Sequence, residues 1–115
     1  MMQKSHGVIN QFVLEAKKRL GDHIHQIVLY GSYARNEESE NSDIDILLLV
    51  DFSDMEIKKI QNDIYDLAFE LELATGKDIS PVIINIEQFR HWKDTLPFYR
   101  NIKREGVVLH DAERV

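Results

Sequence analysis

The feature that most constrains the fold is a nearly unbroken aliphatic run at residues 44–50, which reads IDILLLV. Strands that are buried on both faces carry such continuous apolar sequence, because helices cover the sheet on either side. A second apolar run, at residues 27–30, precedes it; it closes a strand expected over residues 24–30 and is followed by the turn Gly31-Ser32. We therefore expect a sheet built around these two strands, with helices packed on it.

The rest of the chain supplies further helices and strands. Apolar residues recur at helical spacing over residues 5–20 and again over residues 55–74, where Asp51 to Asp54 provide a turn and an N-cap. In the strand expected at residues 78–85, Pro81 cannot donate to a ladder, so this strand must lie at an edge or be bulged there. Two short helices (86 towards Trp92, and Leu96-Pro97 to Gly106), a short strand at 107–109 and a loose tail at 110–115 complete the expected order.

This order predicts an α/β (α+β) fold, a small mixed sheet with helices packed on it, in a single domain spanning residues 1–115. No apolar run approaches the roughly 20 residues that span a bilayer, and the N-terminus has no secretory signal. The absence of cysteine excludes disulfides and thiolate chemistry and suits a cytoplasmic protein. The net charge of -6 argues against nonspecific binding to a nucleic-acid backbone.

Two aspartates mark the start of the second strand. Successive strand side chains point to opposite faces, so Asp43 and Asp45 share one face, about 6–7 Å apart, with Ile44 on the other. Two such carboxylates can converge on one divalent cation. The turn at Gly31-Ser32 presents backbone N–H groups and a hydroxyl that suit phosphate oxygens. A metal platform beside a phosphate-binding turn is the chemistry of phosphoryl or nucleotidyl transfer.

Several other polar residues have two interpretations. Arg35 lies one helical turn after Ser32, where its guanidinium can either reach a phosphate or pair with Glu37 or Glu38. His23 and His25 are spaced like a metal-binding pair on a strand, but no third ligand is apparent nearby, which favours a structural role. The acidic segment between residues 34 and 42 is expected to be a solvated loop, with Ser42 hydrogen-bonded locally at the strand entry.

The combination of Gly31-Ser32 with Ser42-Asp43-Ile44-Asp45 resembles the signature of the polymerase-beta-like nucleotidyltransferase superfamily. The short chain and the Gly-Ser-Tyr-Ala-Arg sequence resemble its minimal nucleotidyltransferase (MNT) branch, the MntA-like antitoxins of HEPN/MNT toxin–antitoxin pairs. The resemblance implies that a nucleoside monophosphate, AMP from ATP, is transferred to a hydroxyl. It also implies that Asp43 and Asp45 hold Mg²⁺ while Gly31, Ser32 and Arg35 bind the nucleotide.

The sequence departs from the family pattern at the third carboxylate, which the family usually carries on a later strand. Alignment with that strand places Val82 at the expected position. Asp78 lies on the same strand face, about 13 Å away by strand rise, with Ser80 between them. Asp78 can substitute only if a bulge near Pro81 shifts the register. Otherwise catalysis is reduced, a partner supplies the carboxylate, or the domain binds nucleotide without turnover.

The acceptor follows only from the resemblance. It implies a HEPN-domain protein as partner and antitoxin as the role of this chain. The alternative is a catalytically weak nucleotide-binding module that neutralises its partner by contact; transfer to a small molecule by a homo-oligomer is a third possibility. The aromatic segment with His91-Trp92 and Phe98-Tyr99 is either an interface with such a partner or, by preference, core packing of the last helices.

Overall fold

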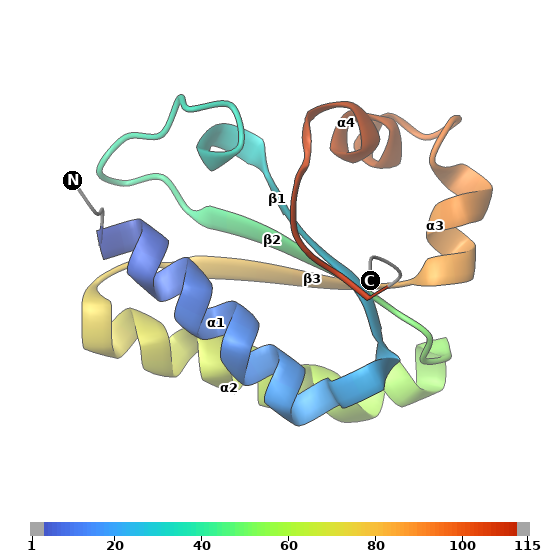
Figure 1. The fold of residues 1–115 in the computed structure, drawn as a ribbon, viewed down its shortest axis with the longest axis horizontal. Helices are drawn as coiled ribbons and strands as arrows, with labels where there is room; N and C mark the ends of the chain where they lie inside the picture. The colour runs from blue at the N-terminus through green and yellow to red at the C-terminus, as the bar shows by residue number, and fades with distance from the viewer. Residues whose placement is uncertain (1–3, 113–115) are drawn as a thin grey trace.

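Four strands form one mixed sheet in the order β3-β2-β1-β4 (Figure 1). The computed structural model describes residues 4–112. In the centre, β1 (Ile24–Tyr30) runs antiparallel to β2 (Ile44–Val50). At one edge β3 (Ile79–Asn85) lies parallel to β2, and at the other β4 (Val107–Asp111) lies antiparallel to β1. The predicted α/β (α+β) class, with a small mixed sheet, is confirmed.

The two outer strands test the finer predictions. The strand β3 lies at the sheet edge, as Pro81 requires, and its pairing with β2 is continuous from Ile44↔Ile79 to Val50↔Asn85. The bulge considered near Pro81 is therefore absent. The prediction of a loose tail from residue 110 is wrong for His110 and Asp111, because both pair with β1 and extend β4 beyond the predicted strand. Residues 113–115 lie outside the described part of the chain.

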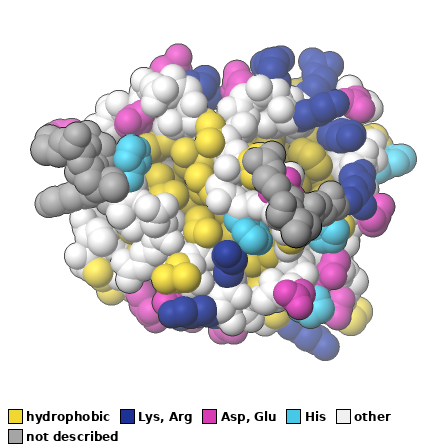
Figure 2. All heavy atoms as spheres, in the orientation of Figure 1, with side chains coloured by type: hydrophobic (Ala, Val, Ile, Leu, Met, Phe, Trp, Pro, Cys, Tyr) yellow, Lys and Arg dark blue, Asp and Glu magenta, His cyan; other side chains and the backbone are white. Residues whose placement is uncertain are grey.

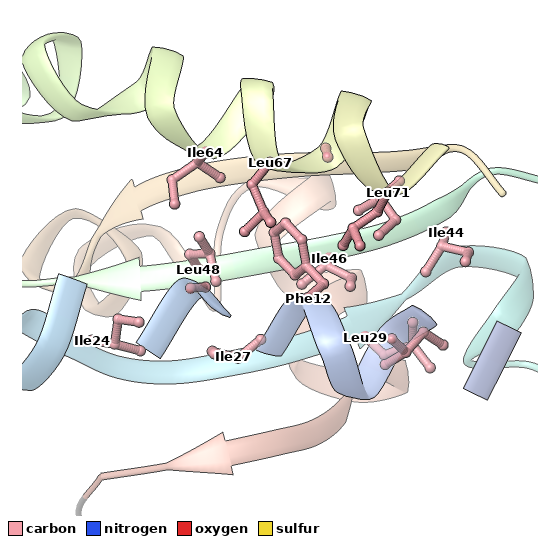
Figure 3. Close-up of a cluster of buried hydrophobic side chains, with 14 of the residues drawn as sticks. Phe12, Ile24, Ile27, Leu29, Ile44, Ile46, Leu48, Ile64, Leu67 and Leu71 are labelled. Carbon is pink, nitrogen blue, oxygen red and sulfur yellow. The ribbon is translucent and has the colours of Figure 1, made fainter. Parts of the chain in front are cut away.

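The helices α1 (Lys4–Leu20) and α2 (Asp54–Thr75) cover one face of the sheet (Figure 1). A capping box between Ser53 and Glu56 fixes the start of α2. Figure 3 shows Phe12 of α1 lying between the strands and α2. The core on this face is fully buried around Phe12, Ile27, Ile44, Ile46, Leu48 and Ile64.

The helices α3 (Ile86–Trp92) and α4 (Pro97–Glu105) pack on the opposite face. Their core is a second cluster that includes Val28, Leu47, Leu49, Ile84, Ile86, Tyr99 and Ile102. Both faces of β2 are thus buried, which is what its continuous apolar sequence predicts. The preferred interpretation of the aromatic segment holds for Tyr99, which is buried, whereas Trp92 and Phe98 stay partly exposed.

Charges of both signs are interspersed on the face shown in Figure 2, where Lys and Arg side chains gather over α3 and α4. Some of these cations pair with acidic neighbours: Lys103 Nζ lies 2.7 Å from Asp94 Oδ1, and Arg90 contacts Glu87 at 2.8 Å. Between residues 4 and 112, no helix combines the length and apolarity needed to cross a membrane.

Candidate active site at the end of the central strands

The antiparallel pairing of β1 and β2 brings the two sequence motifs together. The last residue of β1, Tyr30, is the register partner of Asp45, near the start of β2. The Gly-Ser turn and the aspartate pair therefore meet at the same end of the sheet. Because β3 runs parallel to β2, its first residue, Ile79, and the preceding Asp78 lie at this end too.

The sheet geometry fixes which way the aspartates face. Ile44 is buried in the core beneath α1 and α2, so strand alternation turns Asp45, the next residue of β2, towards the face that carries α3 and α4. Asp43 is exposed and Asp45 is half-buried. Asp43 lies one residue before β2 begins, and its charge acts on Asp45, so the two carboxylates lie close together at this end of the sheet.

Gly31 holds the turn against Asp45. Its φ of +74° lies in the left-handed region, and a Cβ built on it would clash with Oδ2 of Asp45. Only glycine meets both requirements without strain. The chain turns here through a short 3₁₀ helix, Gly31–Tyr33, in which the carbonyl of Gly31 accepts from the N–H groups of Ala34 and Arg35. The N–H groups that begin such a turn have no partner within it, which leaves them available to a ligand.

The electrostatics of Asp45 reflect this crowding. Partial burial and the neighbouring charge of Asp43 raise the pKa of Asp45, and the Arg35 guanidinium opposes that rise. Burial and Asp45 in turn raise the pKa of Tyr30 to about 12. Burial and mutual repulsion make it unfavourable to ionise both carboxylates, and a cation between them would offset this, so the pair fits a site that is completed by a cation.

Arg35 lies at the turn but binds carboxylates. Its Nε donates to Oε1 of Glu37 at 2.8 Å, and Nη1 contacts Oε2 of Glu105 on α4 at 3.4 Å. The predicted pairing with Glu37 is present. Glu105 lies 70 residues further along the chain, and no sequence pattern indicated it as a partner of Arg35.

Asp78, the residue before β3, contacts Asp43. Burial, the charge of Asp43 and a hydrogen bond with Asp43 raise the pKa of Asp78. This contact needs no bulge, because Ile44 pairs with Ile79 and places the preceding residues side by side. Opposite Asp45 stands Ser80, and Val82 stands opposite Leu47. In the described range 4–112, no three or more His, Cys, Asp or Glu side chains are grouped so as to hold a metal ion.

Local contacts hold two of the other candidates, His23 and Ser42. His23 lies in a 3₁₀ turn, where its Nδ1 is 2.7 Å from Oδ1 of Asp51 and its ring stacks on Phe52. The Oγ of Ser42 accepts a hydrogen bond from the N–H of Ser39 at 2.8 Å, which shapes the entry to β2 as expected. Residues 35–41 are exposed, as predicted for a solvated loop.

The contact between Gly31 and Asp45 makes a stability prediction. Gly31→Ala should cost more free energy of unfolding than Gly76→Ala, measured by urea denaturation. Gly76 has a nearly identical φ of +78° but nothing within 4 Å of a Cβ. The control therefore shows the backbone cost alone, about 1–2 kcal/mol. Gly31→Ala should add about 1–3 kcal/mol from displacement of Asp45. Equal costs would contradict the close contact.

The raised pKa of Asp45 makes a prediction about pH. A carboxyl with a raised folded-state pKa stabilises the fold fully below its unfolded pKa of about 4, and this contribution is lost as pH rises through the folded value. Asp45→Asn should therefore raise the free energy of unfolding at pH 7 by about 0.5 kcal/mol, since solvent screens a half-exposed group. It should also weaken the decline of stability above pH 4.

The control is Asp66→Asn, an exposed position on α2 on the other side of the sheet, where no comparable gain is expected. Thermal unfolding from pH 3 to 8 measures all three proteins. A loss of stability in Asp45→Asn at pH 7 would show that Asp45 is not strained by its neighbours.

Comparison with known proteins agrees with this geometry. Residues 9–109 match the family model described as "Nucleotidyltransferase domain". A protein of Methanocaldococcus jannaschii named "Putative protein adenylyltransferase" is 36% identical over 104 residues, which cover 89% of this chain and 94% of that protein. A second protein of that organism with the same description is 29% identical over 79 residues, covering 67% of this chain and 52% of its own length.

Solved structures share the fold at low sequence identity. A nucleotidyltransferase-type protein from Sulfolobus solfataricus superposes with a TM-score of 0.64 at 16% identity, over 94% of this chain and 81% of that one. A toxin–antitoxin complex solved with AMP-PNP gives 0.55 at 19% identity, over 90% and 73%. A mutant of the toxin–antitoxin pair MntA-HpeT also gives 0.55, at 16% identity, over 97% and 76%.

These matches confirm the assignment of the chain as a transferase, and the solved structures confirm the fold. The chain belongs to the nucleotidyltransferase-domain family.

Proposed function

We propose that this chain is a Mg²⁺-dependent nucleotidyltransferase that transfers AMP from ATP to a hydroxyl on a protein partner. The observation that carries the proposal is the contact of Asp45 with Gly31, which joins a paired-carboxylate platform to a phosphate-binding turn. The names of the curated relatives support a protein as acceptor. The toxin–antitoxin complexes with the same fold support the role of antitoxin to a partner protein. We infer a HEPN-domain partner and a cytoplasmic location from the sequence resemblance alone.

The donor set suits the cation. Mg²⁺ binds in phosphate-transfer sites through one or two carboxylates, with substrate phosphates completing its coordination. Asp43 and Asp45 supply that number of carboxylates on one strand face, and their mutual repulsion favours a cation between them. When bound, Mg²⁺ would neutralise charge that develops on the phosphate oxygens.

The chain's own residues then divide the work. The turn at Gly31 and Ser32 holds the triphosphate tail with N–H groups and a hydroxyl, and Arg35 exchanges Glu105 for a phosphate. The acceptor hydroxyl oxygen forms a new bond to the α-phosphorus, and the bond from that phosphorus to the oxygen of the β-phosphate breaks. Pyrophosphate leaves, and the hydroxyl proton passes to solvent or to a carboxylate. Positioning and charge neutralisation account for most of the catalysis in such transfers.

A second candidate function is favoured by one specific observation. Ser80, a poor metal ligand, stands opposite Asp45 on the strand where the family's third carboxylate is expected. The chain would then be a nucleotide-binding module that neutralises its partner by contact, with weak turnover. The same label-transfer experiment distinguishes the two functions.

The experiment uses the purified chain, the protein encoded beside it, Mg²⁺ and α-³²P-labelled ATP. Label should reach the neighbouring protein. Asp43→Asn should reduce the rate of transfer by more than roughly 10–100-fold, the usual effect of removing a residue that only hydrogen-bonds to a metal ligand. The physical reason is that asparagine keeps the shape of Asp43 but binds a cation weakly. Asp66→Asn, remote from the site, should transfer label at the wild-type rate.

Full activity of Asp43→Asn with intact Mg²⁺ dependence would refute the metal platform. Tight binding of the neighbouring protein without label would favour the contact antitoxin. Neither label nor binding would direct the search to small-molecule acceptors.

A further inference from the structure

A hollow of about 150 Å³ opens directly beside the turn, between the end of β1 and one face of α4. Figure 1 shows α4 on the same side of the sheet as the end of β1 and the turn that follows it. The hollow is partly aromatic and partly charged. Its main lining residues are Tyr30, Gly31, Arg35, Phe98, Asn101 and Glu105.

The two kinds of side chain lie at opposite ends of α4. Phe98 and Glu105 are seven residues apart, which corresponds to about 10 Å along a helix. At the aromatic end, the rings of Tyr30 and Phe98 meet edge-to-face with centroids 5.6 Å apart. At the charged end, Arg35 contacts Glu105. A ligand lying along α4 would therefore have its anionic part near Arg35 and its apolar part near Phe98.

The ring of Phe98 is exposed at the hollow. Its neighbour Tyr99 is buried in the core with 9% of its surface exposed, whereas Phe98 is 43% exposed and lines the hollow. Nucleobases stack on exposed aromatic side chains largely independently of base identity. A cavity of about this volume can hold one benzene-sized ring, so the hollow suits a planar ring better than a whole nucleotide.

The hollow also lies about one strand spacing away from Asp45, close enough for one nucleotide to reach both. Tyr30 lines it and is the register partner of Asp45; directly opposed residues on antiparallel strands have Cα atoms about 4.5–5.5 Å apart. Gly31 lines it as well and contacts Asp45. A nucleotide whose α-phosphate lies at the aspartates thus needs only its ribose to span one strand before its base reaches Phe98.

We propose that this hollow binds the nucleobase of the nucleoside triphosphate and that Phe98 is the residue on which the base stacks. The inference rests on the proposed function, because it takes the α-phosphate to lie at Asp43 and Asp45. It adds Phe98 of α4 as a base-binding residue to the site formed by the Gly-Ser turn and the aspartate pair.

The test compares a ligand that has a base with one that does not. Isothermal titration in Mg²⁺ measures the dissociation constants of ATP and of inorganic tripolyphosphate for each variant. Phe98→Ala should weaken ATP binding about tenfold or more, the usual effect of removing a base-stacking ring, and should leave tripolyphosphate binding unchanged. Phe98→Tyr, which keeps the ring, should retain the wild-type affinity for ATP.

The matched control is Phe69→Ala, which removes a somewhat more exposed ring (58% against 43%) from α2 on the opposite face of the sheet. It should change neither affinity. Wild-type ATP affinity in Phe98→Ala would overturn the base site and leave the proposed function standing. Equal weakening of both ligands would also overturn it, since Phe98 would then shape the phosphate site. If the wild-type protein bound neither ligand, the base site and the proposed function would both fail.

Discussion

The site depends on one close approach, that of the Asp45 carboxylate to the backbone of Gly31. The approach is possible because position 31 has no side chain and because its positive φ turns the chain away from the sheet at once. It brings the Gly-Ser turn into contact with the carboxylate of Asp45, whose pKa is raised by partial burial and by the charge of Asp43. A cation that also binds a phosphate would offset the free-energy cost of ionising Asp45 at this position.

The two layers of helices explain how a 115-residue chain can carry that cost. The side chains of β2 alternate between a core under α1 and α2 and a second core under α3 and α4, so the strand is anchored on both faces. Asp43 and Asp45 lie at the one end of β2 where the second core stops. The same α4 that closes this core also presents Phe98, Asn101 and Glu105 to the hollow beside the site. One short helix therefore both packs the second core and lines the hollow that we propose as the base site.

Much of this was predictable from local sequence. The continuous apolar run of β2, the period of α1 and α2, and the turn residues gave the elements with ends close to those observed, and alternation put Asp43 and Asp45 on one face. Pro81 correctly indicated an edge strand. What could not be predicted depends on pairing between distant segments. The partner of Arg35 at Glu105, the contact of Asp78 with Asp43 and the extension of β4 to Asp111 are set by strand register and helix docking.

We infer that the aspartate pair and the Gly-Ser turn form one site. A crystal structure of the chain with Mn²⁺ and a non-hydrolysable ATP analogue tests it most directly, because the anomalous signal of Mn²⁺ locates the cation independently of the protein model. We expect Mn²⁺ to be bound by Asp43 and Asp45, with phosphate oxygens at the N–H groups of the Gly31–Ser32 turn. An analogue bound elsewhere, or Mn²⁺ held without either aspartate, would contradict it.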